Sequence, residues 1–192
     1  MVKVLAFSGS TRNGSYNQAL VENAAEAAKA AGAEVTVISL ADYAMPIFNE
    51  DEESEYGMPE RAQAFKQLLI DHDAFLIASP EYNSSYPALL KNAIDWASRK
   101  TSDDEPMLAA YKDKVIGLMA ASPGGLGGMR VLAVLRMLLQ NIMSVVIPLQ
   151  VSVANAADKF DDNGKLTDET ARKQLTNLTK QLVSMAQKLN AG

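Results

Sequence analysis

Residues 2–17 read VKVLAFSGSTRNGSYN, and this stretch contains the strand, loop and helix start that decide the fold. Val2–Phe7 is a nearly continuous apolar run, which predicts a strand buried on both faces. After a loop of small polar residues, Tyr16–Ala31 carries apolar residues at helical spacing, and Gly32 ends this helix. A buried strand followed directly by an amphipathic helix is the repeating unit of a parallel sheet.

The same alternation continues to the end of the chain. It predicts an α/β fold, with a doubly wound five-stranded parallel sheet and helices on both faces, in a single domain over residues 1–192. Pro148 falls in the last strand and cannot donate to a ladder, so this strand is expected at an edge or a bulge. The other strands are predicted at Glu34–Leu40, Ala74–Ser79, Lys114–Ala121 and Ser144–Val153, and the other helices at Pro59–Ile70, Pro87–Ser98, Gly128–Asn141 and Thr167–Leu189.

Composition excludes several kinds of function. The 192 residues include no cysteine and one histidine, and the formal net charge is −5. Without cysteine there is no disulfide, thiolate metal site or cysteine nucleophile. His72 is expected to be a surface residue at the end of the sheet away from the binding loops. The acidic balance argues against nucleic-acid binding, and the lack of a long apolar run or a signal peptide favours a cytoplasmic protein with no membrane span.

Parallel sheets of this kind bind ligands at the carboxyl ends of their strands, which directs attention to three loops. The first, Ser8–Asn17, leads into a helix whose free N–H groups attract anions. Arg12 adds a guanidinium fork that matches two phosphate oxygens, and Ser10, Ser15 and Asn17 add further donors. We therefore expect a phosphate site, the alternative being an ordinary turn in which Ser15 caps the helix. The loop has neither the lysine of a P-loop nor the glycine spacing of a dinucleotide-binding turn.

The second and third loops indicate a planar ligand. Pro80–Pro87 contains two tyrosines, and Asn83 offers a donor and an acceptor for the edge of a heteroaromatic ring. Its structural alternative is turn formation by proline and asparagine alone. Ser122–Gly128 has four glycines in five positions, which favours positive φ or a ligand against the backbone over a simple hinge. The three loops together predict a mononucleotide-like cofactor such as FMN.

These motifs resemble those of a known family. Gly9-Ser10-Thr11-Arg12-x-x-Ser15-x-Asn17 resembles the phosphate-loop motif of the NADPH-dependent FMN reductases. Residues 80–96 are similar to the second motif of that family over its whole length, and Gly124-Gly125-x-Gly127-Gly128-x-Arg130 is similar to the third. The resemblance implies a flavodoxin-like, three-layer α/β/α fold with sheet order 2-1-3-4-5, and a homodimer or homotetramer.

The resemblance also implies a role for individual residues. The first loop would hold the FMN phosphate, the second would line the isoalloxazine ring, and the third would lie at the other edge of the ring. No catalytic side chain and no metal ion is implied, because the flavin carries the chemistry. In the order of the loops, these residues are Ser10, Arg12, Ser15 and Asn17; Pro80, Glu81, Tyr82 and Asn83; and Ser122, Gly124 and Gly125.

The leading hypothesis for function is an oxidoreductase that passes hydride from NADPH or NADH through FMN to small acceptors. Quinones, flavins, azo compounds and chromate are the acceptors that the resemblance suggests. The alternatives are a flavodoxin-type electron carrier without a pyridine-nucleotide site and a flavin-free domain that binds another phosphate. The residues leave open the physiological acceptor, the choice of nicotinamide and the number of subunits.

Two acidic segments belong to neither motif nor predicted core. The run Glu50–Glu55 is expected to be a solvated loop, with a place at the rim of the ring-side cleft as the alternative. The segment Asp161–Gly164 resembles part of a calcium loop, but Lys159 and Thr170 stand where that loop needs acidic ligands. We therefore predict a plain turn there.

Overall fold

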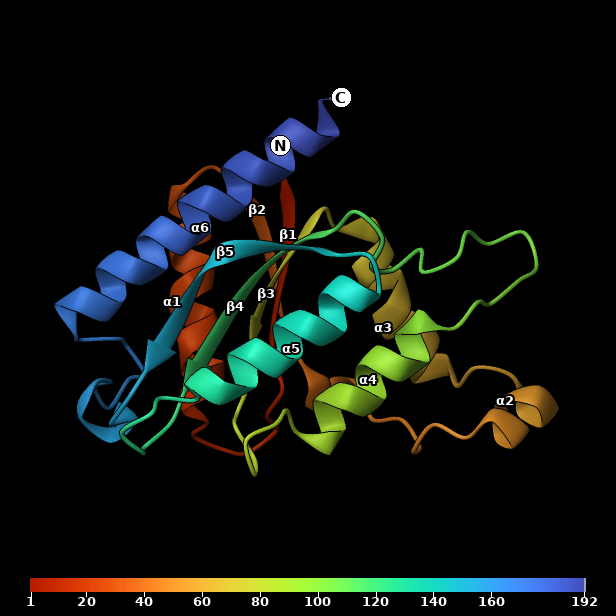
Figure 1. Ribbon diagram of the computed structural model, residues 1–192, viewed down its shortest axis with the longest axis horizontal. Coiled ribbons are helices and arrows are strands. Elements are labelled where there is room, and N and C mark those ends of the chain that lie inside the picture. Colours follow the sequence, from red (N-terminus) through yellow and green to blue (C-terminus); the bar gives the residue numbers. More distant parts are fainter. Residues whose placement is uncertain (192) are drawn as a thin grey trace.

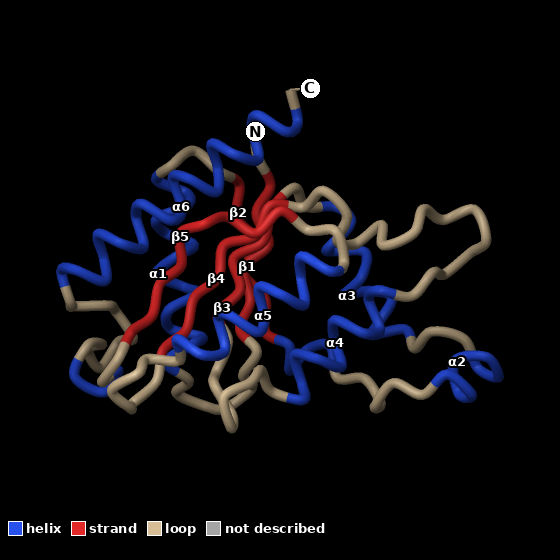
Figure 2. The backbone as a smooth tube through the Cα atoms, in the orientation of Figure 1, coloured by secondary structure: helices blue, strands red, loops and turns tan. Residues whose placement is uncertain are grey.

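The computed structural model describes residues 1–191 and is built on a five-stranded sheet in which all neighbouring strands run parallel (Figure 2). The strand order is β2-β1-β3-β4-β5, which confirms the order that the family resemblance implies. Each strand lies within a residue or two of its predicted position, since apolar runs bounded by polar or glycine residues define them. The strands are β1 (Lys3–Ser8), β2 (Glu34–Ser39), β3 (Ala74–Ala78), β4 (Val115–Ala121) and β5 (Val145–Val153).

Helices cover both faces of the sheet and complete the expected three layers (Figure 1). α1 (Tyr16–Ala30) and α6 (Glu169–Asn190) pack on one face, and α3 (Glu60–Asp71), α4 (Ala88–Ser98) and α5 (Met129–Asn141) pack on the other. Each face has its own apolar cluster, so successive residues of β1 alternate between the two clusters. None of the helices in residues 1–191 combines the length and the apolar character that crossing a bilayer requires.

The last strand shows both features that its proline predicted. β5 is an edge strand, and its register with β4 shifts around Pro148. Ile116 pairs with Val146, whereas Leu118 pairs with Gln150. Pro148 therefore lies where the hydrogen-bond ladder between β4 and β5 is already irregular, so its missing N–H interrupts no regular pairing.

The acidic run is a helix, so the prediction of a loop at Glu50–Glu55 was wrong. α2 (Glu50–Tyr56) begins after Asn49, whose side chain accepts a hydrogen bond from the N–H of Asp51. Four acidic residues in the first turn are stabilised by the positive end of the helix. None of its residues is buried, which is why the segment carries no apolar periodicity that predicts a helix. Arg99 holds α2 to the body through a 2.8 Å ion pair with Glu53.

His72 is buried, and the prediction of a surface histidine was also wrong. It follows the last residue of α3, and its Nδ1 lies 2.7 Å from the carbonyl oxygen of Leu68. Its Nε2 lies 3.0 Å from Oγ1 of Thr36 in β2. The ring thus satisfies one of the carbonyls that a helix end leaves without a partner. Its expected position away from the binding loops is confirmed, since it precedes the amino end of β3.

The segment Asp161–Gly164 is a turn, as predicted. The carboxylate of Asp161 accepts hydrogen bonds from the N–H groups of Asn163 and Lys165, and Phe160 forms a bridge with Leu166. Short 3₁₀ helices at Leu40–Tyr43 and Ala156–Asp158 complete the chain.

Candidate functional site

The loops after β1, β3 and β4 meet at the carboxyl edge of the sheet, because these three strands are neighbours in the sheet. Between them lies a cleft of about 370 Å³, within the roughly 300–1,000 Å³ of small-molecule sites. All the predicted site residues except Asn83, Gly124 and Gly125 line it. The lining residues are Ser10, Arg12, Ser15, Tyr16, Asn17, Pro80, Glu81, Tyr82, Ala121, Ser122 and Pro123.

Hydroxyl groups shape the first loop. Oγ of Ser8 accepts from the N–H of Ser10, and Oγ of Ser10 accepts from the N–H of Arg12. Oγ of Ser15 accepts from the N–H of Gln18 at 3.3 Å, so Ser15 is the N-cap of α1. The capping role that was the alternative for Ser15 is therefore real. It leaves the hydroxyl hydrogen of Ser15 available, because a serine can accept and donate at once.

The N-terminus of α1 has no negative charge of its own. Its first turn contains no acidic residue. Within residues 1–191, the backbone N–H groups of Tyr16 and Asn17 have no protein acceptor. Unpaired N–H groups and the helix dipole make such an end a site for an anion. Since Ser15, Tyr16 and Asn17 line the cleft, this positive end lies beside it.

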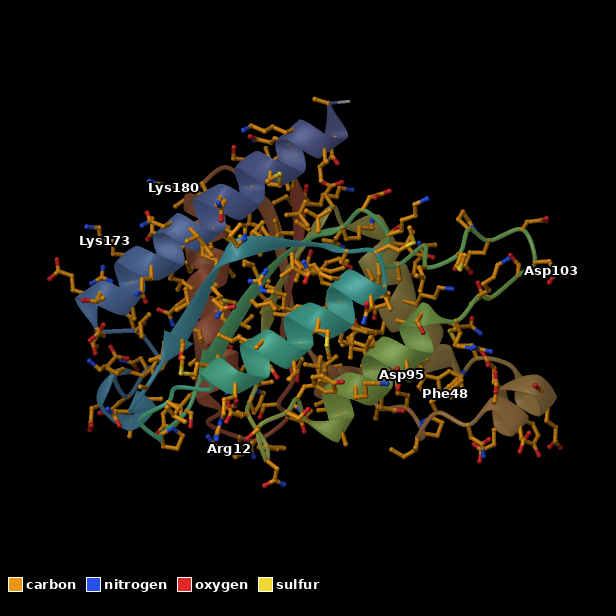
Figure 3. The ribbon with its side chains drawn as sticks, viewed as in Figure 1. Arg12, Phe48, Asp95, Asp103, Lys173 and Lys180 are labelled. Carbon is orange, nitrogen blue, oxygen red and sulfur yellow. The ribbon has the colours of Figure 1, made fainter. Side chains whose placement is uncertain are left out.

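Arg12 is exposed and folds over its own loop at the carboxyl edge, where Figure 3 labels it. Its guanidinium donates to the carbonyl oxygens of Asn13 and Gly14, at 3.2 and 2.8 Å. It also lies 5.8 Å from the ring centre of Tyr16, which stacks on Phe160. In the described part of the chain, no carboxylate forms a salt bridge with Arg12. Its full charge is therefore available to an anion at the start of α1.

Asn17 joins the first loop to the end of β4. It is buried, and its Nδ2 donates to the carbonyl oxygen of Ala121 while its Oδ1 accepts from the N–H of Ala121, both at 2.9 Å. This paired contact uses the amide oxygen and one amide hydrogen. It gives Asn17 a positioning role, fixing the start of α1 against the strand that leads into the third loop.

The second loop ends in a tight turn. Tyr82 and Ser85 exchange two backbone hydrogen bonds, of 2.9 and 3.0 Å. Between them, Asn83 and Ser84 have φ of 52° and 68°, the geometry of a type I′ turn. The turn chemistry that was the alternative for Asn83 is thus observed, and it holds Asn83 at the tip, outside the cleft lining. Tyr82 lines the cleft and is 56% exposed.

The glycines of the third loop divide into two pairs. Gly127 and Gly128 have φ of 60° and 81°, and a Cβ on Gly128 would lie 2.7 Å from the Cβ of Ala120. The fold itself therefore requires these two glycines. Gly124 and Gly125 have no positive φ, and a Cβ on Gly125 would meet nothing within 4 Å. Of the three residues predicted for the site in this loop, Ser122 lines the cleft, whereas Gly124 and Gly125 do not.

Glu81 joins the second loop to the third. Its side chain is 7% exposed, and one carboxylate oxygen accepts from the backbone N–H groups of Arg130 and Val131, at 3.0 and 3.2 Å. The other oxygen accepts from Nε of Arg130 at 2.6 Å. Burial alone raises the pKa of Glu81, but the hydrogen bonds and the charge of Arg130 outweigh it and lower this pKa below its usual value. One sequence signal could have pointed to this pairing, namely Arg130 at the end of the third motif.

Comparison with known proteins identifies the family of the chain. Residues 2–158 match the family model described as NADPH-dependent FMN reductase. The chain belongs to the NADPH-dependent FMN reductase family. A relative at 37% identity, covering 89% of this chain and 88% of its own length, is the NAD(P)H-dependent FMN reductase of Pseudomonas aeruginosa. At 35% identity, covering 98% and 95%, the chain is similar to the NAD(P)H:quinone oxidoreductase of Solanum tuberosum.

A solved structure agrees with these relatives. The chain matches the flavoenzyme NAD(P)H:(acceptor) oxidoreductase FerB of Paracoccus denitrificans with a TM-score of 0.81 and 28% identity, over 98% of both chains. The resemblance stated from the three motifs is thereby confirmed. Family membership makes the protein an FMN-dependent NAD(P)H oxidoreductase, and this favours the leading hypothesis over the electron carrier and the flavin-free domain.

Proposed function

We propose that the cleft at the carboxyl edge holds FMN, with the phosphate at the N-terminus of α1 and the ring between the second and third loops. The observation that carries this proposal is the first turn of α1, where unpaired N–H groups lie beside Arg12, which forms no salt bridge in the described part of the chain, and no acidic residue is present. An anion with several oxygens fits this donor set. The proposal treats residues 1–192 as one FMN-binding domain.

The predicted site residues take different parts in this proposal. Ser10, Arg12 and Ser15 would donate to the phosphate, and Asn17 would hold the helix that presents it. Pro80, Tyr82 and Ser122 would flank the ring. Tyr16, Ala121 and Pro123, which were not predicted from the sequence, also line the cleft. Glu81 would hold the second loop against the start of α5 beside the ring. Asn83, Gly124 and Gly125, which lie beside the cleft, would complete the outer edge of the ring site.

Bound FMN supplies the capacity to accept a hydride and to release two electrons, which no side chain of the cleft has. The chain contributes binding and orientation. Arg12 and the N-terminus of α1 neutralise the phosphate, the paired contact of Asn17 fixes the distance between the first and third loops, and the tight turn after Tyr82 fixes the second. Because Tyr82 is largely exposed, the ring end of the cleft is open to the nicotinamide and then to an acceptor.

We propose quinones as the acceptors, with flavins, azo compounds and chromate as further candidates of the same two-electron chemistry. The potato relative named for quinone supports the first choice. We also propose a homodimer or homotetramer, which the family resemblance implies, and a location in the cytoplasm. Light scattering coupled to size-exclusion chromatography measures the number of subunits.

Anaerobic mixing of the FMN-loaded protein with NADPH or NADH tests the proposed function. We expect the visible absorption of the flavin to disappear when the nicotinamide is added and to return when a quinone is added. An absorption that stays unchanged with both nicotinamides would contradict the oxidoreductase and support an electron carrier. A protein that takes up no FMN would contradict the cofactor site itself.

A further inference from the structure

The N-terminus of α5 is capped by a side chain from another loop. Gly128 occupies the N-cap position and has no side chain with which to cap the helix. Arg130 and Val131 are the second and third residues of α5, where backbone N–H groups have no partner inside the helix. The carboxylate of Glu81 accepts from both, although it lies 49 residues before Arg130 in the sequence. The cap that α5 cannot make locally is therefore supplied by the second loop.

The same carboxylate is also neutralised by a guanidinium. Nη2 and Nε of Arg130 lie 2.5 and 2.6 Å from one oxygen of Glu81, while the other oxygen receives the two N–H groups. The Glu81 side chain is buried, whereas that of Arg130 is 55% exposed. A buried negative charge is thus balanced by one formal positive charge and by the positive end of a helix.

This cluster of charges lies at the ring end of the cleft. Glu81 stands between Pro80 and Tyr82, and all three line the cleft. Moving Glu81 would move Tyr82 and release α5, so the contact fixes the geometry of the ring site. The two charges are opposite, so their effects on the electrostatic potential there partly cancel, and removal of either one alone leaves the other uncompensated.

We propose that Glu81 and Arg130 are a positioning pair that sets the redox potential of FMN in this protein. The inference rests on the proposed function, because it requires FMN in the cleft. Reduction adds two electrons and, at neutral pH, one proton, so reduced FMN carries one more negative charge than oxidised FMN. Charged groups near the ring are one of the means by which a protein tunes such a cofactor. The negative charge of Glu81 disfavours the reduced form, and the positive charge of Arg130 favours it.

Opposite shifts of the midpoint potential test this proposal. We expect Glu81→Gln to raise the potential of bound FMN, since it removes the negative charge and keeps an oxygen for the helix N–H groups. Arg130→Gln should lower it, and the double variant should return close to the wild type. Each single change should alter the ratio of the Kd values for oxidised and reduced FMN about tenfold, which is ~30 mV for a two-electron couple.

Glu105 offers a matched control. It is also a poorly exposed carboxylate, paired with Lys66, and it accepts from the N–H of Thr101. None of these three residues lines the cleft. Glu105→Gln should lower the melting temperature and leave the potential unchanged, which separates loss of a buried pair from a change of charge beside the ring.

The outcomes distinguish the inference from the function on which it rests. If FMN binds and both single variants leave the potential unchanged, or shift it in the same direction, the positioning pair is overturned and the FMN site is retained. If the wild type does not bind FMN, the proposed function fails and the inference fails with it. Should Glu81→Gln not fold, Arg130→Gln at its exposed side chain decides, since an unchanged or raised potential would overturn the proposal.

Discussion

Two helices begin at the same edge of the sheet, each after a loop rich in small residues, and their N-termini differ in charge. The N-cap of α1 is Ser15, which is neutral, and the first turn of this helix contains no acidic residue. The N-cap of α5 is Gly128, and the N–H groups of its second and third residues donate to the carboxylate of Glu81. One positive helix end is left for a ligand, and the other is already occupied by the chain.

The difference gives the proposed cofactor site one orientation. Either helix end has the backbone groups and dipole that attract a phosphate. At α5, a phosphate would meet a carboxylate, whereas at α1 it would meet Arg12 and two serine hydroxyls. In the proposed site, the phosphate therefore binds at α1, and the ring lies on the side of the cleft nearer α5.

The largest effect should come from making α1 resemble α5. Ser15→Asp keeps an N-cap of equal or better quality but adds a negative charge to the phosphate site. Like charges about 4 Å apart at an effective dielectric constant near 20 repel by about 4 kcal/mol, so the Kd for FMN should rise about a thousandfold. Fluorescence titration with FMN measures this change.

Ser15→Asn is the matched control, since asparagine caps a helix as well as aspartate without the charge. Its Kd for FMN should remain within about tenfold of the wild type. If Ser15→Asn weakened FMN binding as much as Ser15→Asp, the hydroxyl of Ser15, and not the absence of a negative charge, would be what the phosphate requires.

Giving α5 a cap of its own should destabilise the protein. Gly128→Ser would place a Cβ 2.7 Å from the Cβ of Ala120 and force a side chain into the left-handed region at φ of 81°. Strain and overpacking should together lower the free energy of unfolding by about 2–4 kcal/mol. Urea unfolding of the variant and the wild type measures this. If the variant were as stable as the wild type, the fold would not require glycine at position 128, and α5 could be capped without Glu81.

Removing the charge that serves α1 should weaken FMN binding by a smaller amount. Hydrogen bonds to charged groups contribute about 1.5–3 kcal/mol, so Arg12→Ala should raise the Kd for FMN about tenfold to a hundredfold. Arg12→Lys keeps the positive charge but loses the two-pronged guanidinium, so its Kd for FMN should lie between those of the wild type and Arg12→Ala. Arg61→Ala on α3, an exposed arginine outside the cleft, should leave the Kd unchanged.

The smallest effect concerns the stability that the cap gives α5. Glu81→Gln should lower the free energy of unfolding of the FMN-free protein by about 1 kcal/mol near neutral pH. The pKa of Glu81 is lower in the folded protein than its usual value of 4.5, so the folded state favours the ionised form. The advantage of the wild type over the variant should therefore be present above about pH 4.5 and be lost as the pH falls below it. If the free energies of unfolding of the wild type and Glu81→Gln differed by the same amount from pH 7 to pH 3, the ionised carboxylate of Glu81 would not be the group that stabilises α5.

The sequence predicted what depends on local patterns. The strands were located because Ser8, Gly9 and similar residues bound short apolar runs, and the cap at Ser15 follows from its place before a helix. The sheet order came from the family resemblance, since spacing alone does not specify it. α2 was missed because a helix without a buried face leaves no periodicity. His72 was wrongly predicted to be exposed because its partner Thr36, on β2, lies 36 residues away in the sequence.

Contacts between loops could not be predicted from local sequence. Both partners of Asn17 belong to Ala121, 104 residues away, and those of Glu81 belong to the start of α5. Asn17 was predicted to bind the phosphate because its amide can donate, and Glu81 was assigned to the ring because the family resemblance implies it. The fold uses the same polar groups to hold the loops together, and the pairing becomes visible when the strands are placed side by side.

The preference for FMN over riboflavin tests the central claim most directly, because the two ligands share the ring and differ in the phosphate. We predict that the wild type binds FMN much more tightly than riboflavin, and that Ser15→Asp abolishes this preference while its Kd for riboflavin stays close to that of the wild type. A Ser15→Asp protein that still prefers FMN by the wild-type ratio would contradict a phosphate at the N-terminus of α1.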